Sequence, residues 1–138
     1  MKSSRPVLVL EDDIVDAMTI RRALKDNEIF NEVVIKKDGE EALQYLKGES
    51  GERPSIILLD LNMPRMNGIE FLKNLRQDEK LNSIPVVVLT TSRSEQDKID
   101  TFKLGISGYI IKSVNYHEFV KIIRTIKNYW EMSEFPES

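Results

Sequence analysis

The chain has 138 residues, of which 41% are hydrophobic and 31% charged, typical of a single soluble globular domain. Its formal net charge of −3 argues against a nucleic-acid-binding surface as the main feature. Without cysteine, and with His117 as its single histidine, the chain cannot form disulfides, zinc–thiolate sites or a multi-histidine metal site. No apolar run approaches the roughly 20 residues that span a bilayer, and the N-terminus does not resemble a signal peptide, so the expected location is the cytoplasm.

Short apolar runs alternate with amphipathic segments along the chain. The apolar runs predict strands at residues 7–10, 32–36, 56–59, 86–89 and 108–111. Helical spacing of apolar residues predicts helices at 16–26, 40–47, 69–77, between Ser94 and Gly105, and at 116–130. This alternation predicts a doubly wound α/β fold, with one five-stranded parallel sheet covered by helices on both faces. One domain should span residues 1–138, with its core from about 6 to 130 and a short acidic tail at 131–138.

Polar side chains follow four of the predicted strands. They are Glu11, Asp12 and Asp13 after the first strand, Asp60 after the third, Thr90 after the fourth and Lys112 after the fifth. Because the carboxyl ends of parallel strands meet at one edge of a sheet, we expect these side chains to lie together. Taken singly, the acids have plainer interpretations, as a turn residue or as an acidic start to a helix.

Together, these side chains suit the chemistry of a phosphoryl group. Carboxylates at one edge are ligands for Mg²⁺, which takes a few carboxylates and keeps several waters. The hydroxyl and the ammonium would bind and neutralise phosphoryl oxygens. A carboxylate that faces such a group can attack it and form an aspartyl phosphate.

Four motifs surround these strand ends. They are Val-Leu-Val-Leu-Glu-Asp-Asp at 7–13, Leu-Leu-Asp-Leu-Asn-Met-Pro at 58–64 with Gly68, Val-Leu-Thr-Thr-Ser at 88–92, and Gly-Tyr-Ile-Ile-Lys at 108–112. With them, from about Pro6 to Trp130, the chain resembles the receiver domains of bacterial two-component response regulators. It is most similar to stand-alone receivers such as the cyanobacterial phytochrome response regulators. The resemblance implies a flavodoxin-like receiver fold and a single-domain signalling protein that catalyses its own phosphorylation and slow dephosphorylation.

The resemblance also implies a role for each matching acidic residue. Asp60 would be the phosphoacceptor, Asp12 a direct Mg²⁺ ligand, and Glu11 a ligand acting through water. Asn62 would offer its backbone carbonyl to the metal. Asp13 lies one residue past the acidic pair, so we predict that Asp12 matters more than Asp13 for metal binding.

On the phosphoryl side, Thr90 and Lys112 would bind the phosphoryl oxygens, and Tyr109 would be the aromatic half of a threonine–tyrosine switch. The expected partners are a histidine kinase or phosphotransfer protein and a downstream protein target, with neither nucleic acid nor membrane involved. Four aromatic residues suggest an output face on the fourth helix, fifth strand and fifth helix, through which a homodimer could also form: Tyr109, Tyr116, Tyr129 and Trp130.

The residue after the site lysine departs from the family pattern, because Ser113 stands where proline is usual. In the family that proline is joined by a cis peptide, which aims the lysine. A cis bond to serine costs about 3–4 kcal/mol, compared with about 0.5–1 kcal/mol before proline. We nevertheless expect a cis Lys112–Ser113 bond, because Lys112 has to reach Asp60 while the strand keeps its register.

Three other interpretations would account for parts of this pattern. A degenerate receiver, acting as an interaction module without phosphorylation, stays open. A phosphohydrolase of the haloacid dehalogenase type needs a second aspartate two residues after the first as a general acid, and Asn62 occupies that position. An EF-hand loop beginning at Asp60 is disfavoured because Pro64 would occupy a liganding position.

Overall fold

The computed structural model describes residues 4–48 and 52–135, and within them five strands and five helices alternate. The strands are β1 (Val7–Leu10), β2 (Val33–Lys36), β3 (Ile56–Leu59), β4 (Val86–Thr90) and β5 (Gly108–Ile111). The helices are α1 (Ile14–Asp26), α2 (Gly39–Lys47), α3 (Gly68–Gln77), α4 (Glu95–Lys103) and α5 (Tyr116–Met132). None of these helices has the length and apolar character needed to cross a membrane.

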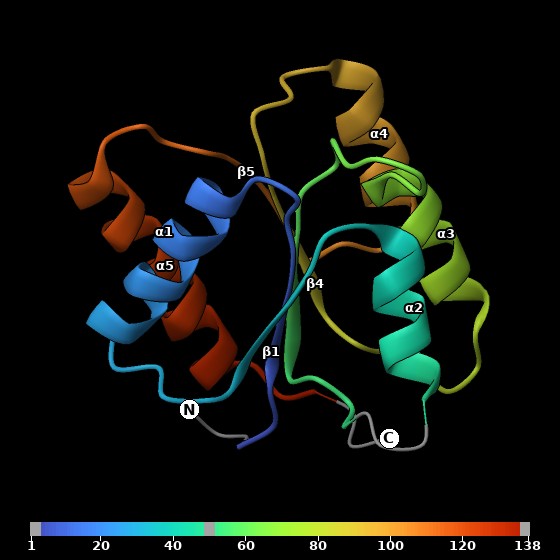
Figure 1. Ribbon diagram of the computed structural model, residues 1–138, viewed down its shortest axis with the longest axis horizontal. Coiled ribbons are helices and arrows are strands. Elements are labelled where there is room, and N and C mark those ends of the chain that lie inside the picture. Colours follow the sequence, from blue (N-terminus) through green and yellow to red (C-terminus); the bar gives the residue numbers. More distant parts are fainter. Residues whose placement is uncertain (1–3, 49–51, 136–138) are drawn as a thin grey trace.

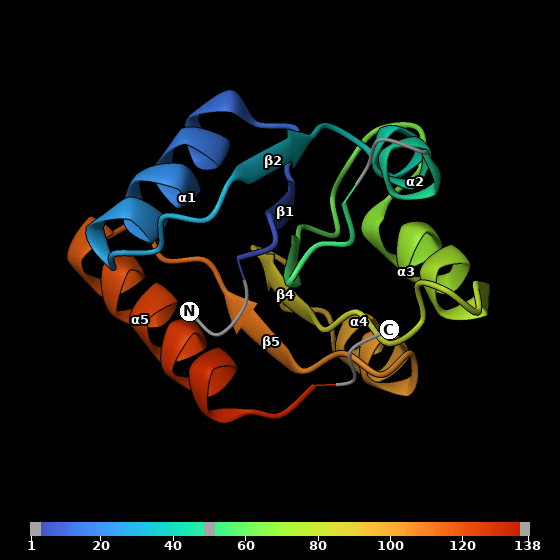
Figure 2. The same ribbon diagram turned by 90° about the horizontal axis from the view of Figure 1, so that it is seen from below.

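One parallel sheet with the strand order β2-β1-β3-β4-β5 forms the centre of the molecule. Helices α1 and α5 cover one face of the sheet, and α2, α3 and α4 cover the other (Figures 1 and 2). The register pairs Leu10 with Leu59 and Thr90 with Ile111, so that the strands end at a common edge. The predicted doubly wound fold is confirmed.

Each central strand contributes to two hydrophobic cores. In β3, Ile57 and Leu59 pack toward α2 and α3, whereas Ile56 and Leu58 pack toward α1 and α5. Since successive side chains of a strand point to opposite faces, burial on both faces requires an uninterrupted apolar run. The first polar residue after such a run therefore marks the sheet edge, and in β3 that residue is Asp60.

Side-chain caps fix where the helices begin. Asp13 accepts a hydrogen bond from the Asp16 backbone N–H at 3.0 Å, which starts α1 two residues earlier than predicted. Asn67 and Glu70 form a capping box at the start of α3. Gly105 has a φ of +75°, the left-handed conformation that ends α4.

The last helix differs from the prediction at its aromatic end. Trp130 is 3% exposed and packs with Ile123 and Ile126 in the core beneath α5, so its expected place on an output face is wrong. The helix continues to Met132, which carries it into the segment predicted as a tail. Tyr129, one residue earlier, is 45% exposed, because consecutive side chains point in directions about 100° apart around the helix.

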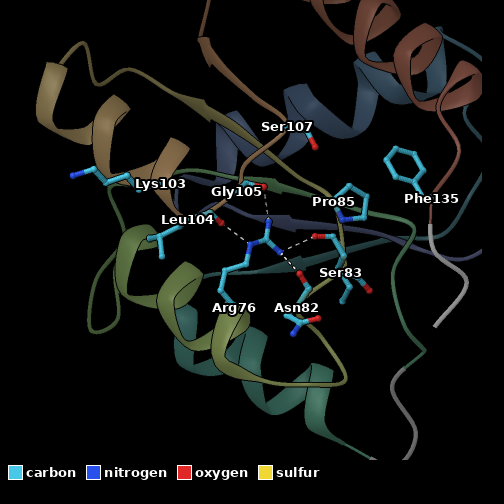
Figure 3. A pocket seen from close by; sticks show the side chains of 10 residues that line it. Arg76, Asn82, Ser83, Pro85, Lys103, Leu104, Gly105, Ser107 and Phe135 are labelled. Carbon is cyan, nitrogen blue, oxygen red and sulfur yellow. Dashed lines mark hydrogen bonds between the residues drawn. The ribbon is translucent and has the colours of Figure 1, made fainter.

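A hollow of about 430 Å³ lies at the opposite edge of the sheet, near the starts of β4 and β5. Arg76, at the end of α3, stands at its centre (Figure 3). Its guanidinium donates hydrogen bonds at 2.6–3.1 Å to four backbone carbonyls, those of Asn82, Ile84, Leu104 and Gly105. This arginine therefore ties α3 to the loops that precede β4 and β5.

Candidate functional site

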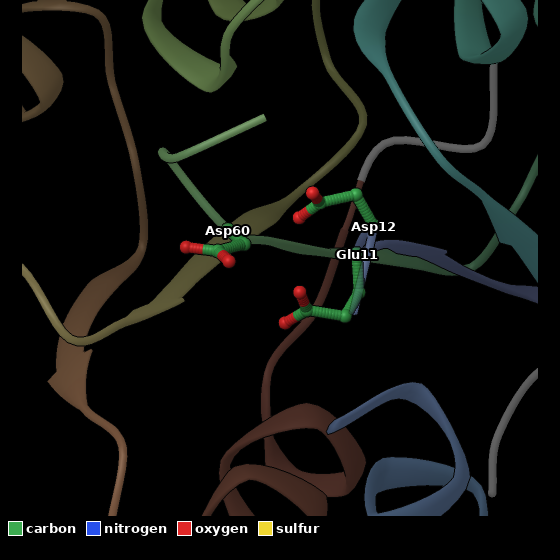
Figure 4. A group of neighbouring side chains, drawn as sticks. All are labelled: Glu11, Asp12 and Asp60. Carbon is green, nitrogen blue, oxygen red and sulfur yellow. The ribbon is translucent and has the colours of Figure 1, made fainter. Parts of the chain in front are cut away.

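Three carboxylates meet at the carboxyl edge of the sheet. Glu11, Asp12 and Asp60 each place an oxygen within 4.8 Å of the others (Figure 4). The Asp60 backbone N–H donates to the Leu10 carbonyl at 3.0 Å, so the adjacent ends of β1 and β3 set this approach. Glu11 is 2% exposed and Asp60 6%, whereas Asp12 lies at the surface.

Lys112 brings a positive charge to these acids from the end of β5. Its Nζ lies 3.2 Å from Asp60 Oδ2 and 3.0 Å from Asp16 Oδ2, and it also contacts Glu11 Oε1. The Lys112 backbone N–H donates to the Thr90 carbonyl at 2.9 Å, which holds the lysine beside β4. One ammonium is thus shared among three carboxylates.

Burial, together with the neighbouring charges, shifts the pKa values of Glu11 and Lys112. Burial, reinforced by the Asp60 carboxylate, raises the pKa of Glu11 from 4.5 to about 7, although the Lys112 ammonium opposes the rise. Burial alone would lower the pKa of Lys112, but its contacts with Glu11 and Asp16 and the nearby Asp60 raise it instead. The Lys112 ammonium therefore stays charged, but it does not fully offset the negative charge of Glu11 and its neighbours. An added cation would be bound favourably here.

Thr90 and Tyr109 are joined through one residue of the loop after β4. Thr90 is fully buried, and its Oγ1 accepts a hydrogen bond from the Ser92 N–H at 3.3 Å. The Tyr109 hydroxyl donates to the Ser92 carbonyl at 2.9 Å. The Ser92 hydroxyl in turn donates to Asp97 in α4 at 2.6 Å, so a chain of hydrogen bonds runs from the site to that helix.

The loop after Asp60 stays close to the carboxylates. The Asn62 N–H donates to Asp60 Oδ1 at 3.3 Å, while the Asn62 side chain is exposed. The Gly68 N–H donates to the Leu61 carbonyl at 3.0 Å and closes the loop. A Cβ at Gly68 would lie 2.5 Å from the Asp60 carbonyl oxygen, so this close approach requires glycine.

Two neighbouring acids have structural roles that were not predicted from the sequence. Asp13 caps α1 and is not a member of the carboxylate cluster. Asp16, which was not predicted as a site residue, is the third partner of Lys112. The available signal was its position, since the first turn of a helix that follows Glu11 and Asp12 must lie over the same edge.

The Lys112–Ser113 peptide is trans, so the expectation of a cis bond is wrong. Lys112 nevertheless reaches Asp60, because the loop bends in another way. Ser113 Oγ accepts a hydrogen bond from the Asn115 N–H at 3.2 Å, and Asn115 caps α5 by accepting from the Glu118 N–H at 3.1 Å. These side-chain hydrogen bonds shape the turn without the cost of a cis bond before a residue other than proline.

Comparison with known proteins defines the class to which this fold and site belong. The response regulator receiver domain family matches residues 7–124, and the chain belongs to that family. Its members are signalling proteins, which agrees with the resemblance found in the sequence motifs.

The relatives of this chain include a cyanobacterial phytochrome response regulator. Response regulator Rcp1 of Synechocystis sp. is 38% identical over 128 residues, covering 90% of this chain and 87% of that protein. The crystal structure of the phosphorylated cyanobacterial phytochrome response regulator RcpA superposes with a TM-score of 0.89 at 36% identity, covering 98% of this chain and 100% of that one. The Mn²⁺-bound form of Rcp1 gives a TM-score of 0.86 at 37% identity, covering 96% and 99%. The predicted similarity to these regulators is confirmed.

Proposed function

We propose that Asp60 accepts a phosphoryl group from the phosphohistidine of a histidine kinase or phosphotransfer protein, in a reaction that depends on Mg²⁺. The observation that carries this proposal is the meeting of Asp60 with Glu11 and Asp12 within 4.8 Å, with the Lys112 ammonium 3.2 Å away. A carboxylate placed beside metal ligands and a fixed cation is suited to attack a phosphorus atom.

The donor set fits a hard divalent cation. Carboxylate oxygens of Asp12 and Asp60 would bind it directly, Glu11 would act through water, and the Asn62 carbonyl would complete the protein ligands. When bound, such an ion neutralises phosphoryl oxygens during transfer. The solved structure of Rcp1 in an Mn²⁺-bound form supports this choice. Asp12→Ala should weaken Mg²⁺ binding far more than Asp13→Ala, because Asp13 is occupied as the cap of α1.

Asp60, Lys112 and Thr90 have different roles in the proposed phosphoryl transfer. An Asp60 carboxylate oxygen forms a bond to phosphorus as the bond from phosphorus to the histidine nitrogen breaks, and that nitrogen keeps the electron pair. Lys112 and Thr90 hold the phosphoryl oxygens as the bond moves. Water later attacks the acyl phosphate, which releases inorganic phosphate and restores the Asp60 carboxylate, so the protein promotes its own phosphorylation and dephosphorylation. The phosphorylated form of the relative RcpA supports this assignment.

The test is labelling with a small phosphodonor. Incubation with Mg²⁺ and acetyl phosphate should give an acid-stable, hydroxylamine-labile label on Asp60. Asp60→Asn should abolish it, because an amide is not a comparable nucleophile, whereas Asp13→Asn should label like the unaltered protein. Stoichiometric label on Asp60→Asn would refute the assignment, and absence of label on the unaltered protein would favour a phosphorylation-independent interaction module.

Output is proposed to run through protein contact at α4 and α5. Ile99 and Phe102 of α4 and Tyr129 of α5 are large apolar side chains exposed by 46%, 56% and 45%. The hydrogen bonds from Thr90 through Ser92 to Tyr109 and α4 connect this face to the site. A homodimer through it should appear by light scattering when beryllofluoride mimics the phosphoryl group, and a monomer at high concentration in both states would exclude it.

A further inference from the structure

The loop between Asp60 and α3 contains a residue in an unfavourable backbone conformation. Arg65 has a φ of +59°, and Glu28 is the only other non-glycine residue of the described ranges with a positive φ. Side chains with a Cβ rarely adopt this left-handed region, which glycine enters freely. Contacts elsewhere in the fold must therefore hold Arg65 in place.

Those contacts come from two acids at the start of α2. Asp38 is the N-cap of that helix, and Glu41 places Oε2 3.5 Å from Arg65 Nη2. Arg65 Nε donates to Asp38 Oδ2 at 3.0 Å, and Nη2 contacts the same oxygen. The other oxygen, Oδ1, accepts a hydrogen bond from the Glu41 N–H at 3.0 Å. Burial raises the pKa of Asp38, whose side chain is 1% exposed, but the Glu41 N–H and Arg65 outweigh it and hold the pKa below its usual range. Asp38 thus joins the start of α2 to the loop after Asp60.

A second contact lies directly beside this ion pair. The Gly39 N–H donates to the Met66 carbonyl at 3.0 Å. A Cβ at Gly39 would lie 2.7 Å from Met66 Cγ, so the loop packs closely against α2. The part of the loop around Arg65 and Met66 therefore packs on α2. Its two ends are held by the hydrogen bonds of the Asn62 and Gly68 N–H groups.

We propose that Arg65 and Asp38 form a clasp that positions the loop after Asp60 for binding a divalent cation. Neither residue touches the carboxylate cluster, so both are positioning residues. The clasp holds the loop that carries Asn62 in one conformation before the ion binds. Binding then does not carry the entropic cost of ordering this loop, so the affinity for the ion is higher. This inference rests on the proposed function, because it assumes that the ion binds at Glu11, Asp12 and Asp60.

The direct test is Mn²⁺ affinity, measured from the electron paramagnetic resonance signal of the free ion without any phosphodonor. Arg65→Gly removes the guanidinium and allows the same φ, so relief of backbone strain cannot by itself weaken binding. We expect its Kd for Mn²⁺ to rise about tenfold, as is usual when a residue that supports metal ligands is removed. Arg65→Lys keeps a positive charge without the forked geometry of the guanidinium. Its Kd for Mn²⁺ should lie between those of the unaltered protein and Arg65→Gly.

Two further variants separate the clasp from loop flexibility. Asp38→Asn keeps an oxygen to cap α2 but loses the nearer of the two carboxylate charges that hold Arg65, and it leaves the loop sequence unchanged. It should raise the Kd, though by no more than Arg65→Gly because Glu41 still pairs with the guanidinium, and the double variant should bind Mn²⁺ like Arg65→Gly alone. Glu28→Gly is the matched control, since it relieves a positive φ far from the site and should leave the Kd unchanged.

The outcomes distinguish this inference from the proposed function. An unchanged Kd in Arg65→Gly or Asp38→Asn, or additive losses in the double variant, overturns the clasp alone. If the unaltered protein does not bind Mn²⁺, both the clasp and the proposed metal site are wrong. If Mn²⁺ binds and the variants weaken it, but acetyl phosphate leaves Asp60 unlabelled, the clasp stands and the proposed phosphoacceptor role is wrong.

Discussion

Binding of Mg²⁺ should strengthen as the pH rises from 6 to 8, because Glu11 must lose a proton to help hold the ion. The pKa of Glu11 is raised to about 7 in the protein without metal. If the bound form requires the carboxylate, the apparent Kd exceeds its limiting value by a factor of about 11 at pH 6 and about 1.1 at pH 8. The affinity for Mg²⁺ should therefore rise about tenfold between pH 6 and pH 8, which corresponds to about 1.4 kcal/mol of binding free energy.

The same pKa fixes the sign of the effect on stability. A folded-state pKa above the unfolded value of 4.5 means that the folded protein holds a proton that the unfolded chain loses. The resulting stabilisation is complete below pH 4.5 and is lost as the pH rises through about 7, a loss of about 3 kcal/mol in the absence of metal. Lys112 does not contribute to this slope, because its raised pKa affects stability only as the pH approaches and passes 10.5.

Calorimetric titration with Mg²⁺ at several pH values tests both statements. Buffers of different ionisation enthalpy should reveal close to one proton released per ion at pH 6 and almost none at pH 8. Glu11→Gln should bind more weakly and lose the pH dependence, whereas Asp13→Asn should retain it. A flat Kd between pH 6 and 8 in the unaltered protein, or an equally steep change in Glu11→Gln, would refute this role for Glu11.

Three substitutions test other parts of the structure. Lys112→Met should destabilise the metal-free protein by about 3 kcal/mol at pH 8 and by less at pH 6, where Glu11 can take up a proton, as urea unfolding with and without Mg²⁺ would show. Gly68→Ala should cost about 1–3 kcal/mol and slow labelling by acetyl phosphate, because its methyl group would displace the Asp60 backbone. Arg76→Ala should lower stability by about 3 kcal/mol while leaving the Kd for Mg²⁺ unchanged, since its four carbonyl partners lie at the opposite edge of the sheet. A shifted Kd in Arg76→Ala would contradict that separation.

The strands and the polar residues at their ends were predictable from the sequence because both follow from burial. A parallel strand covered on both faces needs a continuous apolar run, so the bounds of β1 and β3 agree with the prediction. The same rule places the first polar residue after each run at one edge. The pairing of Leu10 with Leu59 then brings Glu11 beside Asp60 without any further information.

Other features depend on interactions that a linear pattern does not display. The bend after Lys112 is made by the Ser113 hydroxyl and the Asn115 cap, and nothing in their spacing distinguishes this turn from a cis peptide. The place of Asp16 in the first turn of α1 could have indicated its nearness to the site, but its ion pair with Lys112 depends on side-chain conformations that the sequence does not specify. Trp130 is a different case: it continues the apolar spacing of Phe119, Ile123 and Ile126, so its burial could have been predicted from the helix pattern.

The charges at the sheet edge explain why this part of the fold departs from its apolar surroundings. Lys112 is shared by Glu11, Asp16 and Asp60, and Asp12 lies beside them, so four carboxylates and one ammonium leave three negative charges when all are ionised. Replacing such a group by packed apolar side chains would ordinarily preserve or increase stability. Under the proposed function, a divalent cation neutralises two of these three charges, and Lys112 is then available to pair with the charge that a phosphoryl group brings. The raised pKa of Glu11 is then the cost to the metal-free protein of keeping a site ready for two charged ligands.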